Sequence, residues 1–405
     1  MKMTKRKSRK RRRKKSNKRN QTLTTIIIIA AILLGAYFLF TGSDPIGLFD
    51  QEDEPAASEM DEATLQATPP GGQNSDWWQV YFTTPQTIND PENLSGSIAE
   101  TLIGHISDAE DSIHIASFEF NLTSVADALV AAQERGVEVQ WVTDDEHGLE
   151  ADHEEDHGQF ALLEDAGIPV KDDDRSALMH NKFWIFDNQT VWSGSTNITR
   201  NGIFRNNNNV VVLESLELAG IYEREFAEMW NGEFGPRSPS TIEEQSVTID
   251  GSPVRVLFAA EDEVIDQLVP LIENAQSSIR FMAFSFTHDD LGTAVLDRAN
   301  AGVDVMGIFE TRGSETEYSE LPALYCAEVP VRQDGNPGTF HHKVFIIDNE
   351  TVITGSFNFS NNANESNDEN VLIITNAAVA EQYLHEFDQR WTEASEPESA
   401  DMNCK

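Results

Sequence analysis

The sequence predicts an α/β protein in which two similar halves, each an α/β sandwich with a mixed sheet, follow one N-terminal transmembrane helix. Three observations support this prediction. The chain of 405 residues is long enough for two domains of ordinary size. Strand and helix patterns alternate through both halves. Matching segments recur at a nearly constant spacing, which indicates an internal duplication.

The N-terminal region is a basic block followed by an apolar stretch. Residues 1–20 contain 13 Lys or Arg and no acidic residue, and residues 22–41 contain no charged residue. A helix of that length spans about 30 Å, which is enough to cross the hydrocarbon core of a bilayer. Basic residues before such a span favour a cytoplasmic N-terminus and an extracytoplasmic body. We therefore expect a cytoplasmic tail (1–21) and an uncleaved single-pass anchor (22–41). A cleaved signal peptide is the alternative, and either one exports the body.

The segment 42–76 is acidic and rich in Pro, Gly and Ser, which is typical of a flexible linker. The chain holds 29 basic and 69 acidic residues, and 13 of the basic residues fall within 1–20. The remaining 16 basic and 69 acidic residues give the rest of the chain a formal charge of −53. Such a body repels polyanions at a distance, which counts against tight non-specific binding of nucleic acids.

Each element of the first half has its own local signal. The expected elements are strands at 112–120, 137–143, 182–187, 191–193 and 210–213 and helices at 124–135, 160–166 and 216–230. Thr123 or Ser124 can cap the first of these helices, and Gly136 can end it. The Asp-Asn pair at 187–188 predicts a tight turn between two strands.

The second half repeats the first. Ser112–Phe120 parallels Ser278–Phe286 at an offset of 166 residues, and His180 parallels His341 at an offset of 161. The boundaries that follow from this repeat are 77–235 and 252–394 for the halves, 236–251 for the linker between them and 395–405 for a polar tail.

One pattern, His-x-Lys-x4-Asp, occurs once in each half. Its residues are His180, Lys182 and Asp187 in the first half and His341, Lys343 and Asp348 in the second. In a strand, residues two apart point to the same face, so the histidine and lysine side chains project together. An imidazole beside a fixed ammonium suits phosphoryl transfer, because the imidazole attacks or moves a proton while the ammonium offsets phosphate charge.

A Gly-Ser-x-Asn pattern follows each motif at the same distance. Ser195 and Ser356 lie fifteen residues after the motif histidines, and Asn197 and Asn358 lie seventeen residues after them. Hydroxyl and amide donors at these positions can hold phosphate oxygens. Chance does not account for two such copies, so the sequence predicts a catalytic site rather than a binding module with an inactive site.

This paired pattern resembles the phospholipase D superfamily, and the resemblance covers nearly all of residues 77–394. It implies that the halves pack about a pseudo-twofold axis and that both motifs meet in one cleft of a monomeric catalytic unit. It also implies that one motif histidine attacks phosphorus to form a phosphohistidine, while the other protonates the leaving oxygen. The resemblance further implies that no metal and no other cofactor takes part in this chemistry.

The resemblance also implies a role for each motif residue. His180 and His341 act as nucleophile and acid–base group, and Lys182 and Lys343 bind the phosphate. The remaining residues complete the pocket or support the strands: Ser195, Asn197, Ser356, Asn358, Asp187 and Asp348.

The halves differ at one position that bears on the histidines. Glu369 in the second half is a carboxylate of the kind that orients a catalytic histidine in many superfamily members, and the first half has Asn208 at the matching position. If Glu369 crosses to the other half, it orients His180, and His180 is then the nucleophile, which is the assignment that we favour. If it stays within its own half, it orients His341.

The resemblance favours phospholipid head groups as the substrate of a membrane-anchored enzyme. Two alternatives share the same motifs. One is an exported, metal-independent endonuclease that acts on nucleic acid, and the other is a synthase of a diphosphatidyl lipid (cardiolipin).

The sequence leaves one question about the cysteines open. Cys326 and Cys404 can form a bridge in an exported body, and two free thiols fit equally well.

The remaining histidines stay outside the expected site. His147, His153 and His157 lie in an acidic segment that favours a solvated loop over a metal site. His342 lies between His341 and Lys343 in the motif strand, so its side chain should point away from theirs.

Overall fold

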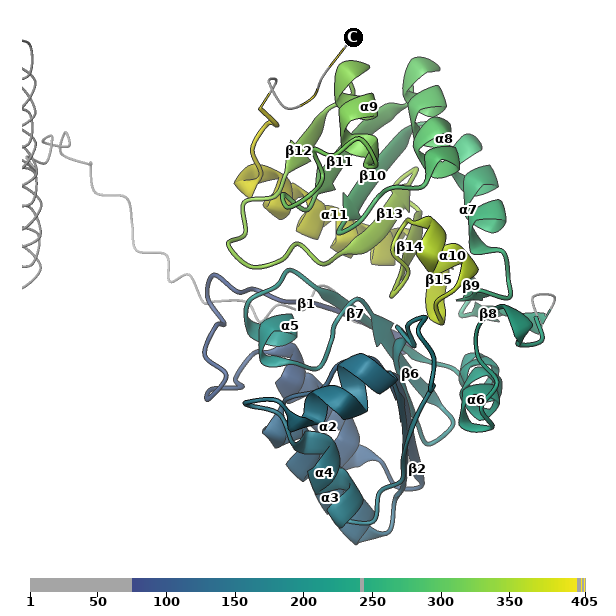
Figure 1. Cartoon of the computed structure of the whole chain (residues 1–405). Coiled ribbons are helices and arrows are strands. Elements are labelled where there is room, and N and C mark those ends of the chain that lie inside the picture. The colour runs from purple at the N-terminus through teal and green to yellow at the C-terminus, as the bar shows by residue number, and fades with distance from the viewer. Residues whose placement is uncertain (1–74, 241–243, 399–401, 403, 405) are drawn as a thin grey trace, which may run out of the picture. The chain divides into compact units, whose positions relative to one another are not determined.

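The computed structural model describes residues 75–398 except 241–243, together with Met402 and Cys404. This part of the chain forms two α/β halves (Figure 1). The expected basic tail (1–21), the anchor (22–41) and nearly all of the expected linker (42–76) lie outside the described residues. Among the residues described, no helix combines the length and the apolar character that a membrane span requires.

The first half is built on a seven-stranded sheet with the order β1-β7-β6-β5-β2-β3-β4. The neighbours β2, β3 and β4 are parallel, and the other neighbouring pairs are antiparallel, so the sheet is mixed as expected. Its strands are β1 (Trp78–Phe82), β2 (Ser112–Ser117), β3 (Glu138–Thr143), β4 (Val170–Asp172), β5 (Lys182–Phe186), β6 (Thr190–Gly194) and β7 (Asn209–Glu214). Its helices are α2 (Ile98–Asp108), α3 (Thr123–Arg135), α4 (Gln159–Asp165), α5 (Arg200–Phe204) and α6 (Leu216–Trp230).

The second half repeats this arrangement with an eight-stranded sheet of the order β12-β11-β10-β13-β14-β15-β9-β8. Here β10, β11 and β12 are the parallel neighbours. Its strands are β8 (Ser246–Ile249), β9 (Ser252–Ala259), β10 (Ser278–Ala283), β11 (Asp304–Phe309), β12 (Val331–Gln333), β13 (Lys343–Ile347), β14 (Thr351–Gly355) and β15 (Glu369–Thr375). Its helices are α7 (Val264–Glu273), α8 (Asp289–Asn300), α9 (Glu320–Cys326), α10 (Asn361–Glu365) and α11 (Ala377–Glu393). Strand β8 falls within the segment 236–251 that separates the repeats.

Turn and cap residues account for the ends of several elements. Asp187 and Asn188 both have φ of 52° and join β5 to β6, as the turn signal predicted. Gly136 ends α3 in the left-handed conformation. The expected side-chain cap of α3 at Thr123 or Ser124 is wrong, because the helix begins one residue earlier than expected and its N-cap is Leu122.

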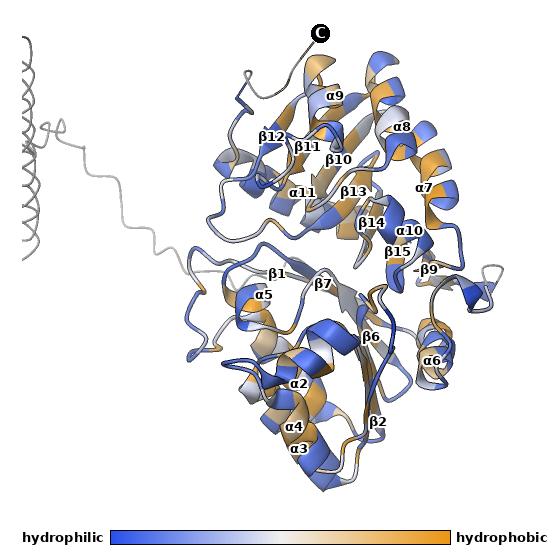
Figure 2. Cartoon of the chain, in the orientation of Figure 1, coloured by the Kyte–Doolittle hydropathy of each residue, from blue (hydrophilic) through white to orange (hydrophobic). Residues whose placement is uncertain are grey.

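The apolar core has three parts, and the middle part joins the halves. Two clusters lie between a sheet and its own outer helices, with α2, α3 and α4 in the first half and α7, α8 and α9 in the second. The third contains residues from both sheets together with α6 and α11. Figure 2 shows the apolar residues along the strands and on one side of helices such as α7, with hydrophilic residues in the connecting loops. The shared cluster fixes one half against the other, which a site made from both halves requires.

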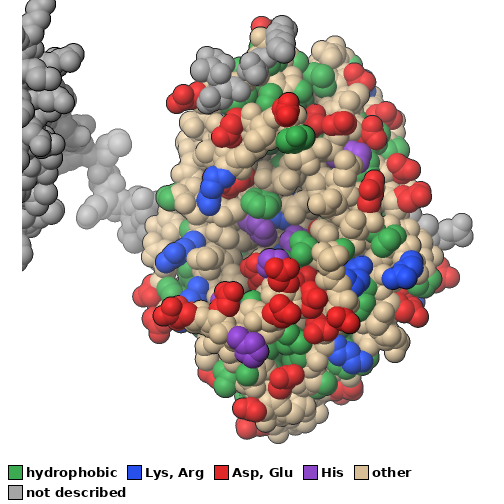
Figure 3. Space-filling view, in the orientation of Figure 1, with side chains coloured by type: hydrophobic (Ala, Val, Ile, Leu, Met, Phe, Trp, Pro, Cys, Tyr) green, Lys and Arg blue, Asp and Glu red, His purple; other side chains and the backbone are tan. Residues whose placement is uncertain are grey.

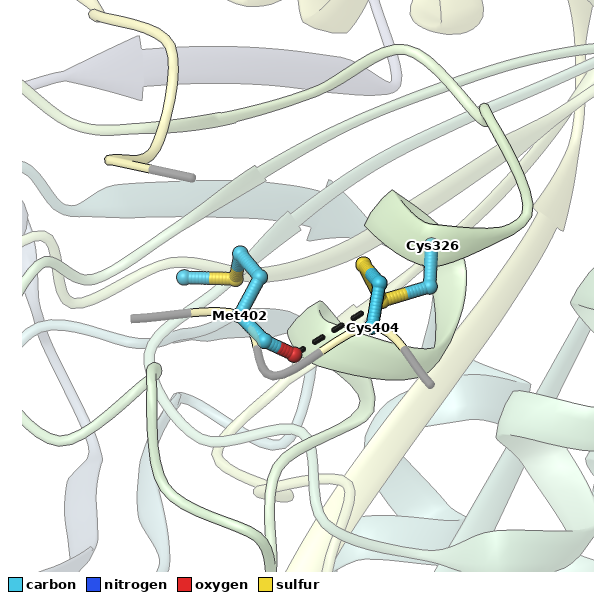
Figure 4. The surroundings of a disulfide bond; sticks show 3 residues. All are labelled: Cys326, Met402 and Cys404. Carbon is cyan, nitrogen blue, oxygen red and sulfur yellow. Dashed lines mark hydrogen bonds between the residues drawn. A yellow bond between two sulfur atoms is a disulfide. The ribbon is translucent and has the colours of Figure 1, made fainter. Parts of the chain in front are cut away.

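The two cysteines form a disulfide that ties the C-terminal tail to α9 (Figure 4). The Cα atoms of Cys326 and Cys404 are 5.4 Å apart, within the usual range for such a bond. Met402 beside it is buried in the core of the second half. Of the two alternatives that the sequence left open, the structure contains the bridge.

Candidate active site

Each motif histidine is held by the backbone of the opposite half. The N–H of His180 donates to the carbonyl of Asp368 at 2.9 Å, and the N–H of His341 donates to the carbonyl of Asn207 at 2.9 Å. These bonds lie just before β5 and β13, so each motif strand starts at the seam between the halves, where the charged groups of the two motifs are close enough to act on one another. Figure 3 shows histidine side chains gathered in a hollow in the middle of the molecule, with acidic side chains crowded on one side of it.

The two lysines of the motifs are buried and similarly placed. Nζ of Lys182 donates to the carbonyl of His180 at 2.6 Å, and Nζ of Lys343 donates to the carbonyl of His341 at 2.8 Å. Each ammonium also lies over an aromatic ring, at 4.8 Å from the Phe118 ring for Lys182 and at 4.7 Å from the Phe284 ring for Lys343. Neither is in a short ion pair within the described part of the chain, so both can take up a phosphate.

The histidines receive different partners from across the seam. Nδ1 of His180 lies 2.8 Å from Oε2 of Glu369. Nδ1 of His341 lies 2.9 Å from Oδ1 of Asn208 and 3.0 Å from the carbonyl of Ser195. All of these partners accept hydrogen bonds, so Nδ1 carries the proton in both rings and Nε2 keeps its lone pair.

The serines after the motifs support these partners rather than presenting free hydroxyl groups. Oγ of Ser356 donates to Oε2 of Glu369 at 2.6 Å, and Oγ of Ser195 donates to Oδ1 of Asn208 at 2.8 Å. The expectation that both hydroxyl groups hold phosphate oxygens therefore differs from what the structure shows, since each proton is already used to fix the group that orients a histidine.

The asparagines after the motifs have amide groups that are only partly hydrogen-bonded. Asn197 donates from Nδ2 to Oε2 of Glu119 at 2.9 Å. The Oδ1 atoms of Asn197 and Asn358 are buried and have no hydrogen-bond partner among the described residues. The NH₂ group of Asn358 also makes no hydrogen bond with any described residue, so it can donate to a phosphate.

The motif aspartates lie at the far ends of the motif strands. Asp187 accepts hydrogen bonds from the N–H groups of Glu110, Asp111 and Ser112. Asp348 accepts from three N–H groups in the same way, from Gln276, Ser277 and Ser278. Both residues therefore join a motif strand to the start of the neighbouring strand and lie away from the histidines.

Burial sets the protonation states at the seam. It lowers the pKa of His180 and of His341 well below the usual histidine value, and the neighbouring lysines lower both further. Burial also lowers the pKa of Lys182 to about 8 and raises that of Glu369 to about 7. Both imidazoles are therefore neutral near pH 7 before substrate arrives. A bound phosphate anion favours their protonation.

Two buried carboxylates beside the motifs were missed in the sequence. Oδ2 of Asp144 accepts the N–H of Met179 at 3.1 Å, and Oε2 of Glu310 accepts the N–H of Phe340 at 2.6 Å. Met179 and Phe340 are the residues immediately before the two motif histidines. A signal was present, because Asp144 and Glu310 each directly follow a strand and are separated by 166 residues, the offset of the repeat.

The acidic histidine segment forms a short helical turn, not a simple loop. His147 is exposed and packs on the Phe118 ring at 4.9 Å. The carboxylates of Asp144, Asp145 and Asp173 lie within 4.8 Å of one another, and no histidine belongs to this group in the described part of the chain.

The oxygens of two of these carboxylates are already engaged. Asp144 accepts from the N–H groups of His147 and Met179, and Asp173 accepts from the N–H of Asp145 and from Arg175. These hydrogen bonds give both carboxylates a structural role, because they join the turn at 145–150 to the residue before His180 and to the segment after β4.

His342 lies away from the other motif side chains. Its Nδ1 lies 3.1 Å from Nδ2 of Asn209, and its Nε2 lies 3.2 Å from Oε1 of Glu386 on α11. It therefore packs into the core that joins the halves, as the strand alternation predicted.

Comparison with known proteins agrees with this geometry. Residues 102–230 and 268–391 match the protein family described as "Cardiolipin synthase, PLD-like domain". Phospholipase D of Rickettsia prowazekii (strain Madrid E) is 37% identical over 125 residues, which cover 31% of this chain and 61% of the relative. Mitochondrial cardiolipin hydrolase of Xenopus tropicalis is 34% identical over 132 residues, which cover 33% of this chain and 63% of the relative. The chain thus spans about three fifths of the length of these curated relatives.

A solved structure shares the arrangement of both halves. The phosphatidylserine synthase of Haemophilus influenzae Rd KW20 has a TM-score of 0.57 at 15% identity, over 73% of this chain and 84% of that chain. This likeness concerns the fold. The family match covers most of both halves and contains both motifs, and the chain therefore belongs to the phospholipase D superfamily.

Proposed function

We propose that the protein is a phosphodiesterase that hydrolyses the head groups of phospholipids through a phosphohistidine. The observation that carries this proposal is that the two His-Lys pairs lie close enough at the contact between the halves for their charges to act on one another, with a carboxylate on only one of the histidines. Two ammonium groups match the charge of a phosphodiester, and two neutral imidazoles with fixed tautomers can divide attack and proton transfer.

The chemistry follows from the tautomers. Nε2 of His180 attacks phosphorus, a P–N bond forms and the P–O bond to the leaving alcohol breaks. The leaving oxygen takes a proton from Nε2 of His341, which acquires that proton when the anionic phosphate binds beside it. Water then attacks phosphorus and gives a proton back to His341, and the P–N bond breaks. Lys182 and Lys343 offset the charge of the phosphoryl oxygens in both steps.

The charge of the body supports a lipid over a polynucleotide. Residues 21–405 carry 16 basic and 69 acidic residues. A long polyanion is repelled by such a surface, whereas a lipid brings a single head group into the cleft from a membrane. The curated relatives named above are a phospholipase D and a cardiolipin hydrolase, which agrees with a lipid substrate.

We further propose that residues 22–41 anchor the protein in a membrane, with the N-terminus in the cytoplasm and the body outside it. The basic block before that segment supports this orientation, and the Cys326–Cys404 disulfide supports an oxidising compartment for the body. Protease added to intact spheroplasts should then cut within 42–76 and release the body. A body that is digested only after lysis contradicts export.

The substrate is tested with the purified full chain in detergent. We expect release of the head group from phosphatidylcholine or phosphatidylglycerol and no nicking of supercoiled plasmid, with His180→Ala as the inactive control. Plasmid nicking that His180→Ala abolishes, without lipid turnover, would instead identify an endonuclease.

A further inference from the structure

The contact between the halves has two parts that are equivalent by the repeat, one at each motif histidine, and these parts are called the first seam and the second seam below. At the first seam, Leu178 and His180 exchange backbone hydrogen bonds with Asp368, and at the second seam Thr339 and His341 exchange the same bonds with Asn207. The side chains at these seams differ. The carboxylate of Asp368 accepts hydrogen bonds from Arg175 and from the N–H of Gly235, so the first seam is closed by an ion pair.

The second seam lacks this closure. Asn207 stands at the position of Asp368, and Asn336 stands at the position of Arg175. The amide of Asn207 is completely buried, and neither its oxygen nor its nitrogen has a hydrogen-bond partner in the described part of the chain. A cavity of about 500 Å³ lies at this seam. The residues that line it include Arg205, Asn206, Arg312, Asn336, Gly338 and Thr339.

The charge of this cavity is opposite to that of the body. Two arginines and no acidic residue line it among the described residues. The guanidinium of Arg205 makes no hydrogen bond or ion pair with any described residue, while that of Arg312 is 3.0 Å from Glu310. Glu393, which accepts a hydrogen bond from the lining residue Gln86, is itself paired with Arg390 of α11. The unpaired charge in the cavity is therefore positive.

Two residues that line the cavity lie close along the chain to His341 and its partner Asn208. These lining residues, Asn206 and Thr339, come two residues before Asn208 and His341, whose side chains are in contact at 2.9 Å. Extended chain advances about 3.3 Å per residue, which places this wall roughly 7 Å from that contact. One substrate molecule can thus reach both places.

We propose that this cavity binds a second phosphate of a lipid substrate, so that lipids with two phosphate groups are preferred over lipids with one. The inference rests on the proposed function. Arg205 supplies an unpaired guanidinium, the group best suited to phosphate oxygens. Asn206 accepts the N–H of Thr339 at its Oδ1, which leaves its NH₂ group as a further donor. Since the rest of the surface repels polyanions, the second phosphate comes from a lipid rather than from nucleic acid.

The test compares the full chain, in mixed detergent micelles, on diphosphatidylglycerol and on phosphatidylglycerol. Arg205→Gln should lower the ratio of kcat/KM for the two lipids by about tenfold or more, as expected for loss of a charged hydrogen bond. Arg200→Gln is the matched control, because Arg200 is exposed at the start of α5, the helix that ends just before Arg205, and does not line the cavity. The control should keep the wild-type ratio. An unchanged ratio in Arg205→Gln overturns the proposal.

A binding measurement separates this proposal from the proposed function. Titration calorimetry with glycerol 1,3-bisphosphate and glycerol 1-phosphate should show tighter binding of the bisphosphate to the wild-type chain, and Arg205→Gln should remove the difference. If neither lipid is hydrolysed but this difference is found, the proposed function fails and the anion site stands. Equal binding of both probes to the wild-type chain overturns the site. If Arg205→Gln weakens binding of single-stranded DNA and leaves bisphosphate binding intact, the assignment to lipid is overturned.

Discussion

Nδ1 of His180 lies 2.8 Å from Oε2 of Glu369, a residue of the opposite half, whereas His341 contacts the neutral amide of Asn208 in the equivalent place. The two histidines of the site are therefore chemically unlike. A carboxylate stabilises the positive charge that an imidazole gains when it attacks phosphorus, and it holds the ring in the tautomer that attacks. We therefore propose that His180 is the nucleophile and that His341 is the acid.

The first prediction concerns this carboxylate. Glu369→Gln should slow formation of the phosphoenzyme by about 10- to 100-fold, because a hydrogen bond to a charged group is replaced by one to a neutral group. Acid quench followed by peptide mapping should place the phosphoryl group of the wild-type enzyme on the peptide that contains His180. Label on the peptide that contains His341, or full activity in Glu369→Gln, contradicts the assignment.

The second prediction concerns the unity of the site. His180→Ala and His341→Ala should each lower kcat by at least about 10²-fold, the usual loss when a general acid or base is removed. The double variant should be little slower than either single variant, because residues that act as a unit are not additive. Substantial activity in either single variant would mean that the halves carry independent sites. Circular dichroism of each variant checks that the fold is retained.

The motif residues and the α/β halves could be predicted from the sequence because each has a local signal. Each of these signals determines the structure of only a few neighbouring residues. Examples are the His-Lys spacing, the turn at Asp187 and Asn188 and the glycine after α3. The repeat then placed the same elements in the second half. No local signal predicts which residues of the other half a motif strand contacts.

The contacts across the seam were therefore the part that sequence left open. The sequence showed that Glu369 has no carboxylate equivalent in the first half, but only tertiary packing decides that it reaches His180 rather than His341. The directions of the Ser195 and Ser356 hydroxyl groups depend on the same packing. The sequence therefore predicted contacts with phosphate, whereas the structure shows contacts with Asn208 and Glu369. Asp144 was overlooked because it lies in an acidic segment, where one buried carboxylate looks like its exposed neighbours.

The third prediction concerns the carboxylates that hold the residues before the motif histidines. The two carboxylate oxygens of Asp144 accept one N–H group each, from His147 and from Met179. The side chain of Asp144→Asn has only one oxygen, so one of these N–H groups loses its partner. A buried donor left without a partner costs about 1–3 kcal/mol. We expect a lower melting temperature and a fall in kcat of about tenfold, because His180 directly follows Met179 and loses its fixed position.

A matched control separates position from stability. Asp152 accepts three backbone N–H groups, those of Gly158, Phe160 and Ala161, at the start of α4, and it bonds to neither motif nor the residues directly before them. Asp152→Asn should therefore lower the melting temperature while kcat stays near the wild-type value. Equal losses of kcat in Asp144→Asn and Asp152→Asn would show that Asp144 acts on stability alone.

The last prediction concerns a carboxyl pair between α6 and the segment after β9. Glu225 hydrogen-bonds to Glu261, and burial raises the pKa of Glu225 well above its usual value and that of Glu261 to about 8, with Glu228 and Asp262 adding to both shifts. In the unfolded chain glutamate ionises near pH 4.3, so from about pH 4.5 to 8 the unfolded state has released protons that the folded state keeps. Stability contributed by this pair is therefore fully present below that window and is lost as pH rises through it.

Thermal unfolding from pH 5 to pH 8 tests this pair, which lies between the two halves. The melting temperature of the wild-type protein should fall across this range. The melting temperature of Glu225→Gln should fall less, because the neutral amide can donate to Glu261 without taking up a proton. Glu217→Gln, an exposed change on the same helix, should follow the wild-type curve. Parallel curves for Glu225→Gln and the wild type would show that the pair does not link protonation to the joining of the halves.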